Sequence, residues 1–306
     1  MTLVVGLPRD ERRTPALHLA AIATRSANEH LVVCAVVPSA WPPSLARIDA
    51  EYQAYLDTST QETLDAAAAE LPPDVPATFV RHHARSASAG LLEVAAEHHA
   101  RMLILGSSSA GSWGRVAFGS VAERLLHTSP VPIALAPRGF RSRAGARIRR
   151  VTAAFGATEG ANDLVLAAAG VAARVDASVR IASFAVRPRA IITAGVGPRA
   201  EDAVVAEWAR DIERAQQAAM AQVSELPTVP SPLETVIGYG ENWDEALEDI
   251  EWADGDVLVV GSSAVGPAAR VFLGSRASKI IRRSPVPVVV VPRGAVPELV
   301  ARAEQP

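Results

Sequence analysis

The sequence predicts an α/β fold of two doubly wound, Rossmann-like domains, each built on a five-stranded parallel sheet. The first observation is an internal repeat: when residues 101–139 are laid over residues 256–294, 17 of the 39 positions are identical. The second is that short, wholly apolar runs alternate with longer helical patterns in each half, which is typical of a parallel sheet covered on both faces. The third is the length of 306 residues, enough for two domains of about 150 residues each. The period is a whole domain, so a tandem duplication with a pseudo-twofold relation is expected.

The first half is expected to contain five strands and four helices. The apolar runs that predict strands lie at residues 3–7, 30–37, 76–82, 101–106 and 131–137. The patterns that predict helices lie at residues 12–27, 45–71, 89–100 and 119–128.

The second half repeats this order. Strands are predicted at residues 150–156, 178–186, 233–239, 256–261 and 286–292. Helices are predicted at residues 160–175, 201–225, 243–253 and 274–283. In the second of these helices an apolar stripe at three-to-four-residue spacing predicts core packing; it consists of Val204, Trp208, Ile212 and Ala215.

These patterns divide the chain into four parts. Residues 1–139 form the first domain and residues 148–294 the second. Residues 140–147 are polar and basic, as in a linker, and residues 295–306 are expected to form a C-terminal tail.

Composition excludes several classes of function. A net charge of −3 and a pI near 6.2 argue against a nucleic-acid-binding surface. No run of about 18 apolar residues predicts a membrane span, and the first residues do not resemble a signal peptide, so a cytoplasmic protein is expected. Cys34 is the single cysteine, which excludes an internal disulfide and predicts a buried, inert thiol.

One glycine- and serine-containing stretch occurs in both halves at the carboxyl end of a predicted strand. Gly106 and Gly261 end the two strands, and Gly119-Ser120 and Gly274-Ser275 begin the helices that follow. The N–H groups and dipole of a helix amino end attract anions, and glycine lets the backbone approach a phosphate closely. The serines could add a hydroxyl and cap each helix. A phosphate cradle is one interpretation, and a tight turn followed by a capped helix is the other.

These residues resemble the nucleotide-binding signature of the universal stress protein family, in its tandem two-domain form. The resemblance extends over nearly the whole chain. The family pattern is Gly-x2-Gly-x9-Gly-Ser/Thr. The stretch from Gly119 to Gly139, "GSVAERLLHTSPVPIALAPRG", is similar to the sequence that follows in family members. The resemblance implies that an adenine nucleotide such as ATP is the candidate ligand. It also implies that the fifth strands, which carry Pro132 and Pro287 as expected at a sheet edge, pair with each other within the chain. A homodimer is a further expectation.

Both copies depart from the family pattern. Ser109 and Ala264 replace the middle glycine. The acidic residue that ATP-binding members carry after the first strand is replaced by Pro8 and Gly156. We therefore expect degenerate nucleotide clefts.

Four further residues have two interpretations each. Arg115 and Arg270 occupy the same place in the two loops, where they could meet a phosphate or lie in solvent. Val36 and Phe184 end the second strands, where the family lines its base pocket, but core packing explains them equally well.

The sequence thus favours a non-catalytic, cytoplasmic stress-response sensor or interaction module. The alternative is an ATP-binding universal stress protein with at most slow hydrolysis. No catalytic nucleophile with a paired base is found, and no metal site is expected, because the pairs His82-His83 and His98-His99 lack a ligand spacing.

Overall fold

The computed structural model describes residues 2–8, 15–39, 47–156, 160–186, 198–262 and 274–305, with only the backbone described at 47–50 and 198–206. In the first half the strands are β1 (Thr2–Leu7), β2 (His30–Pro38), β3 (Ala77–Ala84), β4 (Ala100–Gly106) and β5 (Ile133–Ala136). The helices are α1 (Pro15–Ala27), α2 (Arg47–Glu70), α3 (Ala87–Glu97) and α4 (Ser120–Thr128).

The second half has the same succession of elements. Its strands are β6 (Arg150–Ala154), β7 (Ser178–Val186), β8 (Leu233–Gly240), β9 (Asp256–Gly261) and β10 (Val288–Val291). Its helices are α5 (Ala161–Arg174), α6 (Pro198–Ser224), α7 (Trp243–Glu248) and α8 (Ser275–Arg283), followed by a short 3-10 turn (Arg293–Ala295) and α9 (Val296–Ala303). The predicted α/β fold and the order of its elements are confirmed.

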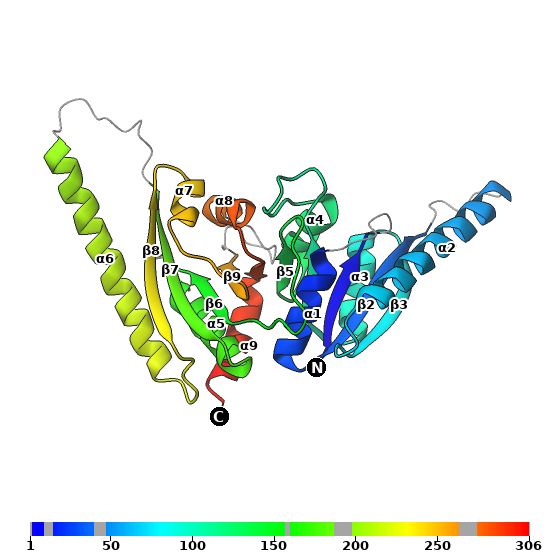
Figure 1. Cartoon of the computed structure of the whole chain (residues 1–306), viewed down its shortest axis with the longest axis horizontal. Helices are drawn as coiled ribbons and strands as arrows, with labels where there is room; N and C mark the ends of the chain where they lie inside the picture. The colour runs from blue at the N-terminus through cyan, green and yellow to red at the C-terminus, as the bar shows by residue number, and fades with distance from the viewer. Residues whose placement is uncertain are drawn as a thin grey trace.

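The ten strands form one sheet in the order β3-β2-β1-β4-β5-β10-β9-β6-β7-β8. Within each half the strands are parallel, and β5 pairs antiparallel with β10, with Leu135 opposite Val288. Pro132 and Pro287 stand just before these strands, where each carbonyl accepts a hydrogen bond of 2.9 Å from the neighbouring strand. The expected pairing of the fifth strands therefore joins the halves about a pseudo-twofold axis (Figure 1).

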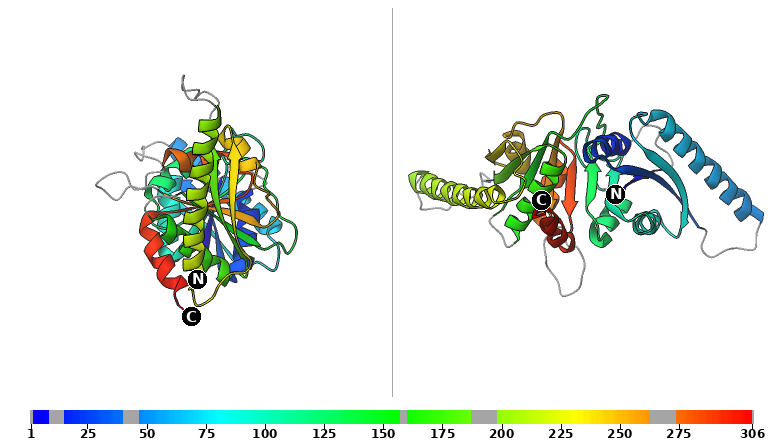
Figure 2. Two further views of the ribbon diagram at one scale, coloured as in Figure 1. Left: turned by 90° about the vertical axis from the view of Figure 1, so that its left-hand side faces the viewer. Right: turned by 90° about the horizontal axis from the view of Figure 1, so that it is seen from below.

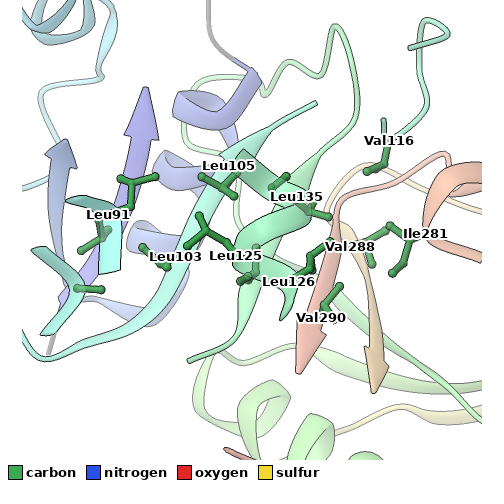
Figure 3. Packing of buried hydrophobic residues seen from close by; sticks show 14 of the residues in the cluster. Leu91, Leu103, Leu105, Val116, Leu125, Leu126, Leu135, Ile281, Val288 and Val290 are labelled. Carbon is green, nitrogen blue, oxygen red and sulfur yellow. The ribbon is translucent and has the colours of Figure 1, made fainter. Parts of the chain in front are cut away.

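The core is shared across this junction. On one face of the sheet, α3 and α4 of the first half and α8 of the second half cover a single buried cluster. Leu125 and Leu135 of the first half lie in this cluster with Ile281 and Val288 of the second (Figure 3). At roughly 25 cal/mol per Å² of buried apolar surface, a continuous core of this kind resists separation of the halves.

On the opposite face each half has its own core. Buried residues of α1 and α2 pack over β1 and β2 in the first half, and buried residues of α5, α6 and α9 pack over β6, β7 and β9 in the second. The long helices α2 and α6 lie at the two far ends of the molecule (Figures 1 and 2).

Three expectations need correction. Trp208 is 43% exposed, although the stripe on α6 predicted core packing. The 27 residues of α6 extend about 40 Å, whereas the 8 residues of β8 extend about 27 Å, so the sheet cannot cover the whole helix.

Helix α7 ends at Glu248 instead of continuing to residue 253, and the Trp252 indole donates to the Leu247 carbonyl at 2.7 Å. The expected tail contains α9, which packs against α5 where Gly170 leaves room for Ala303.

The linker is held against α1. The Arg25 guanidinium donates to the Ala146 carbonyl at 2.8 Å, and the Ile148 amide donates to Ser26 Oγ at 2.7 Å. Arg147 in turn donates to the carbonyl of Arg25 at 2.7 Å. These bonds fix the path of the chain from one half to the other.

Candidate functional site

The candidate site of the first half lies at the carboxyl ends of β1 and β4, where an open parallel sheet usually binds its ligand. Strand β4 ends at Gly106, and the loop of residues 107–119 leads to the amino end of α4. A Cβ at Gly106 would lie 3.8 Å from Ala16 Cβ, so the strand end passes close to the start of α1. The site is thus framed by two helix starts and one loop.

The loop satisfies several of its own backbone donors. The Ser108 amide donates to the Ala117 carbonyl at 2.9 Å, and the Gly111 amide donates back to the Ser108 carbonyl at 3.2 Å. Ser107 Oγ donates to the Ala136 carbonyl at 2.7 Å and accepts from the Ala117 amide at 3.2 Å. A phosphate cradle needs outward-pointing N–H groups, and these bonds turn several of them inward.

The residues after β5 hold the tip of the loop. The Gly114 amide donates to the Arg138 carbonyl at 2.9 Å, and the Arg138 guanidinium donates to the Gly111 carbonyl at 2.5 Å. The same guanidinium lies 5.8 Å from the centre of the Trp113 ring, which also covers Gly139. The loop is therefore a closed, cross-linked turn.

Arg115 points away from its own half. Its guanidinium donates to the Glu248 carboxylate on α7 of the second half. The side chains of Arg115 and Glu248 are 25% and 59% exposed. The arginine thus has a carboxylate partner, which neither of the two interpretations from the sequence anticipated.

The helix starts differ from the expected capping. Gly119 and Gly274 are the N-cap residues, neither with a side-chain cap bond, and Ser120 and Ser275 are the first helical residues. The prediction that the two serines cap these helices is therefore wrong. Their backbone is already helical, while an N-cap residue keeps an extended backbone.

The two helix starts also differ in charge. The first turn of α4 contains Glu123, whereas the described first turn of α8 contains no acidic residue and includes Arg276. A carboxylate at a helix amino end already complements the dipole and repels an added phosphate. The amino end of α8 is therefore better suited to an anion than that of α4.

The remaining residues of the predicted signature are placed as follows. Ser109 is exposed on the loop. At Gly261 a Cβ would lie 3.2 Å from Leu164, so this strand end packs closely on α5. Ala264 and Arg270 lie outside the described residues.

Val36 and Phe184 both belong to packed layers. Val36 is 6% exposed, and its methyl groups lie against Gly90 of α3, where an added Cβ would come within 2.8 Å. Phe184 lies 6.4 Å from the ring of Trp243 on α7. These contacts favour the core-packing alternative for both residues.

The positions after the first strand of each half carry no carboxylate. Pro8 and Gly156 are both exposed. A Cβ added at Gly156 would meet no atom of the described residues within 4 Å.

Several other polar groups lie outside the signature loops. His82 faces Glu93 of α3 at 2.7 Å and His83 faces Asp57 of α2 at 3.2 Å, so the adjacent histidines point to opposite faces of the sheet. Cys34 is fully buried, and burial raises the pKa of its thiol to about 12.

Sequence reasoning missed a buried ionic cluster. The Asp256 carboxylate is 2% exposed and accepts from Arg150 at 2.6 and 3.0 Å, while Arg180 lies 3.6 Å away. Desolvation and the nearby Arg150 lower the pKa of Arg180, whose guanidinium lies 4.7 Å from the centre of the Trp252 ring. Each charge belongs to a different strand, so no local spacing could reveal the cluster.

Comparison with known proteins gives consistent matches along the chain. The model of the universal stress protein family matches residues 1–137 and 147–292. Universal stress proteins of Mycobacterium tuberculosis and Mycobacterium bovis are 40% identical over 301 residues, covering 95% of this chain and 100% of theirs.

Solved structures agree on the fold. A universal stress protein from Archaeoglobus fulgidus matches with a TM-score of 0.57 and 18% identity, covering 95% of this chain and 98% of its own. A putative universal stress protein from Pseudomonas aeruginosa matches with a TM-score of 0.56 and 12% identity, covering 99% and 98%. A universal stress protein in complex with cAMP covers 42% of this chain at 22% identity and a TM-score of 0.26, too distant to bear on ligand binding here. Among the described helices, none is long and apolar enough to cross a membrane.

Proposed function

Because this chain belongs to the universal stress protein family, we propose that it is a non-catalytic, cytoplasmic stress-response sensor or interaction module whose first-half nucleotide cleft is degenerate. The proposal rests mainly on the loop between β4 and α4. Its Ser108, Gly111 and Ala117 amides donate within the loop, and a nucleotide would have to break these bonds to use the same donors. Breaking a hydrogen bond of this kind costs about 1 kcal/mol each.

Charge supports the same conclusion. The Arg115 guanidinium is held by Glu248, so it is not directed at a phosphate of its own half. Glu123 adds a negative charge at the amino end of α4, where a phosphate would otherwise be attracted. The lost glycine at Ser109 and the proline at Pro8 remove two further features that the family resemblance associates with ATP.

Nucleotide binding by the second half is the second candidate. Arg276 stands in the first turn of α8 without an acidic neighbour in that turn, and a Cβ added at Gly156 would meet no atom of the described residues within 4 Å. An adenine nucleotide bound there would give an ATP-binding protein with one active half and at most slow hydrolysis.

Calorimetric titration with ATP, with and without Mg²⁺, tests the proposal. We expect no saturable binding in the micromolar range to the unmodified protein. Two double variants then compare the halves. One carries Pro8→Asp and Ser109→Gly in the first half, and the other carries Gly156→Asp and Ala264→Gly in the second. We expect a gain in ATP affinity only for the second pair, because the first-half loop keeps its internal hydrogen bonds.

Opposite results would overturn the proposal. Micromolar ATP binding that Gly119→Val abolishes and Gly274→Val leaves intact would show a working first-half cleft. If Gly274→Val abolished ATP binding and Gly119→Val left it intact, nucleotide binding by the second half would be established. ATP turnover that either variant removes would show that the protein is an enzyme.

A further inference from the structure

A large cavity lies between the halves, away from the candidate nucleotide clefts. Its volume is about 750 Å³, within the range of small-molecule sites. Most of the strand residues that line it stand in the amino-terminal parts of β1, β4, β6 and β9, and β10 contributes Val289 and Val291. The nucleotide clefts lie at the carboxyl ends of the strands and involve the loops that follow them. Residues of α1, α5 and α9 line it. These helices lie on the side of the molecule where both termini are found (Figure 1).

Most of the cavity wall is aliphatic. Five valines of the sheet contribute, and small residues of the helices leave the space unfilled. These lining residues are Val151, Val257, Val259, Val289, Val291, Ala23, Ala27, Ala167, Ala168 and Val171. An aliphatic lining of this kind suits an apolar ligand.

The charged lining residues form one interacting group with an excess of positive charge. Arg101 pairs with Glu29 at 3.5 Å, and Arg302 pairs with Glu298. Arg174, in the last turn of α5, has no carboxylate within ion-pair distance among the described residues. Three cations and two carboxylates therefore leave one unmatched guanidinium at the cavity.

The arginines repel one another. Desolvation and the charges of Arg101 and Arg302 lower the pKa of Arg174. Desolvation and Arg302 likewise lower the pKa of Arg101. An anion placed among the three guanidinium groups would relieve this repulsion and accept charge-assisted hydrogen bonds.

We propose that this cavity binds an amphipathic anion, with its alkyl chain against the valines of β9 and β10 and its carboxylate at Arg174. The lining of the site fits a single-chain molecule of the fatty-acid class, because its aliphatic residues adjoin one group of cations. This site is separate from the nucleotide clefts, so its existence does not depend on the function proposed above.

Calorimetric titration of the intact protein with dodecanoate tests the site. We expect one dodecanoate per chain, with affinity falling about fourfold for each methylene removed in decanoate and octanoate. Dodecyltrimethylammonium, with the same chain and a positive head, should bind at least tenfold more weakly.

Charge variants test the head-group contact. Arg174→Gln should weaken dodecanoate binding about tenfold, and Glu298→Gln should tighten it severalfold because it frees Arg302. Arg124→Gln, an exposed arginine of α4 on the opposite face, is the matched control and should have no effect. Val171→Trp should fill the cavity and abolish binding, with a melting curve to establish that the variant is folded.

Three outcomes would overturn the proposal. One is the absence of saturable dodecanoate binding. Another is equal affinity for the cationic amphiphile. The third is an equal response to Arg174→Gln and Arg124→Gln, which would show that the guanidinium does not contact the ligand.

Discussion

The guanidinium of Arg115 binds the carboxylate of Glu248, so a residue of the first half's signature loop contacts a helix of the second half. The repeat places Arg270 at the equivalent position. This contact places the signature loop at the junction between the two halves.

The energetic weight of this contact is predicted to be small. Glu248→Gln should lower the free energy of unfolding by less than about 1 kcal/mol, because both side chains are partly exposed and water screens the pair. Urea denaturation measures the change, and Asp254→Asn, which affects a more exposed pair with Arg143, is the control. A loss above 2 kcal/mol would mean that the halves depend on this bond.

The buried cluster around Asp256 is predicted to matter far more. Asp256→Asn removes the charge that faces Arg150 and leaves Arg180 buried without a counter-ion at 3.6 Å. We expect a loss of about 3–5 kcal/mol in urea denaturation. Asp211→Asn, in an exposed pair on α6, should cost under 1 kcal/mol. Equal effects of the two substitutions would contradict the assigned burial.

Close packing of α7 on β8 leads to a steric prediction. A Cβ at Gly238 would lie 2.1 Å from the Ala246 carbonyl oxygen, so Gly238→Ala must displace α7. We expect a loss of at least 1–3 kcal/mol by thermal or urea unfolding. Gly156→Ala is the matched control, because its Cβ would meet no atom of the described residues within 4 Å, and it should change stability by less than about 1 kcal/mol. If both variants were equally stable, the close approach of α7 would be disproved.

The pair between Arg25 and Asp74 predicts a pH dependence. Hydrogen bonds from Arg25 lower the pKa of Asp74 below its ordinary value of 3.8. A depressed folded-state pKa contributes stability above the ordinary value, and this contribution is lost as the pH falls through the folded-state value. Asp74→Asn should therefore flatten the stability profile below pH 4 and leave its shape near neutrality unchanged. Unfolding curves at several pH values measure this, and an unaltered acid limb would contradict it.

The sequence alone determined the duplication, the order of the elements and the α/β class. Each strand is a short apolar run, and the regular alternation of such runs with longer helical patterns predicts the strands of a parallel sheet. The pairing of the fifth strands was expected because the family resemblance implied it. Pro132 and Pro287 precede the two strands and leave their edges free to pair. Covering both faces of the sheet then required the observed alternation with helices.

Only the tertiary structure decided which side chains meet. Glu248, the partner of Arg115, is 133 residues away in the sequence. The arginines that contact Asp256 come from β6 and β7. The cavity at Arg174 is formed by helices and strands of both halves, so no segment carries its pattern. Periodicity reports which face of an element is apolar, but contacts between distant charges depend on how the elements pack. For the same reason the sequence could propose a nucleotide cleft and could not show that its loop is closed by its own hydrogen bonds.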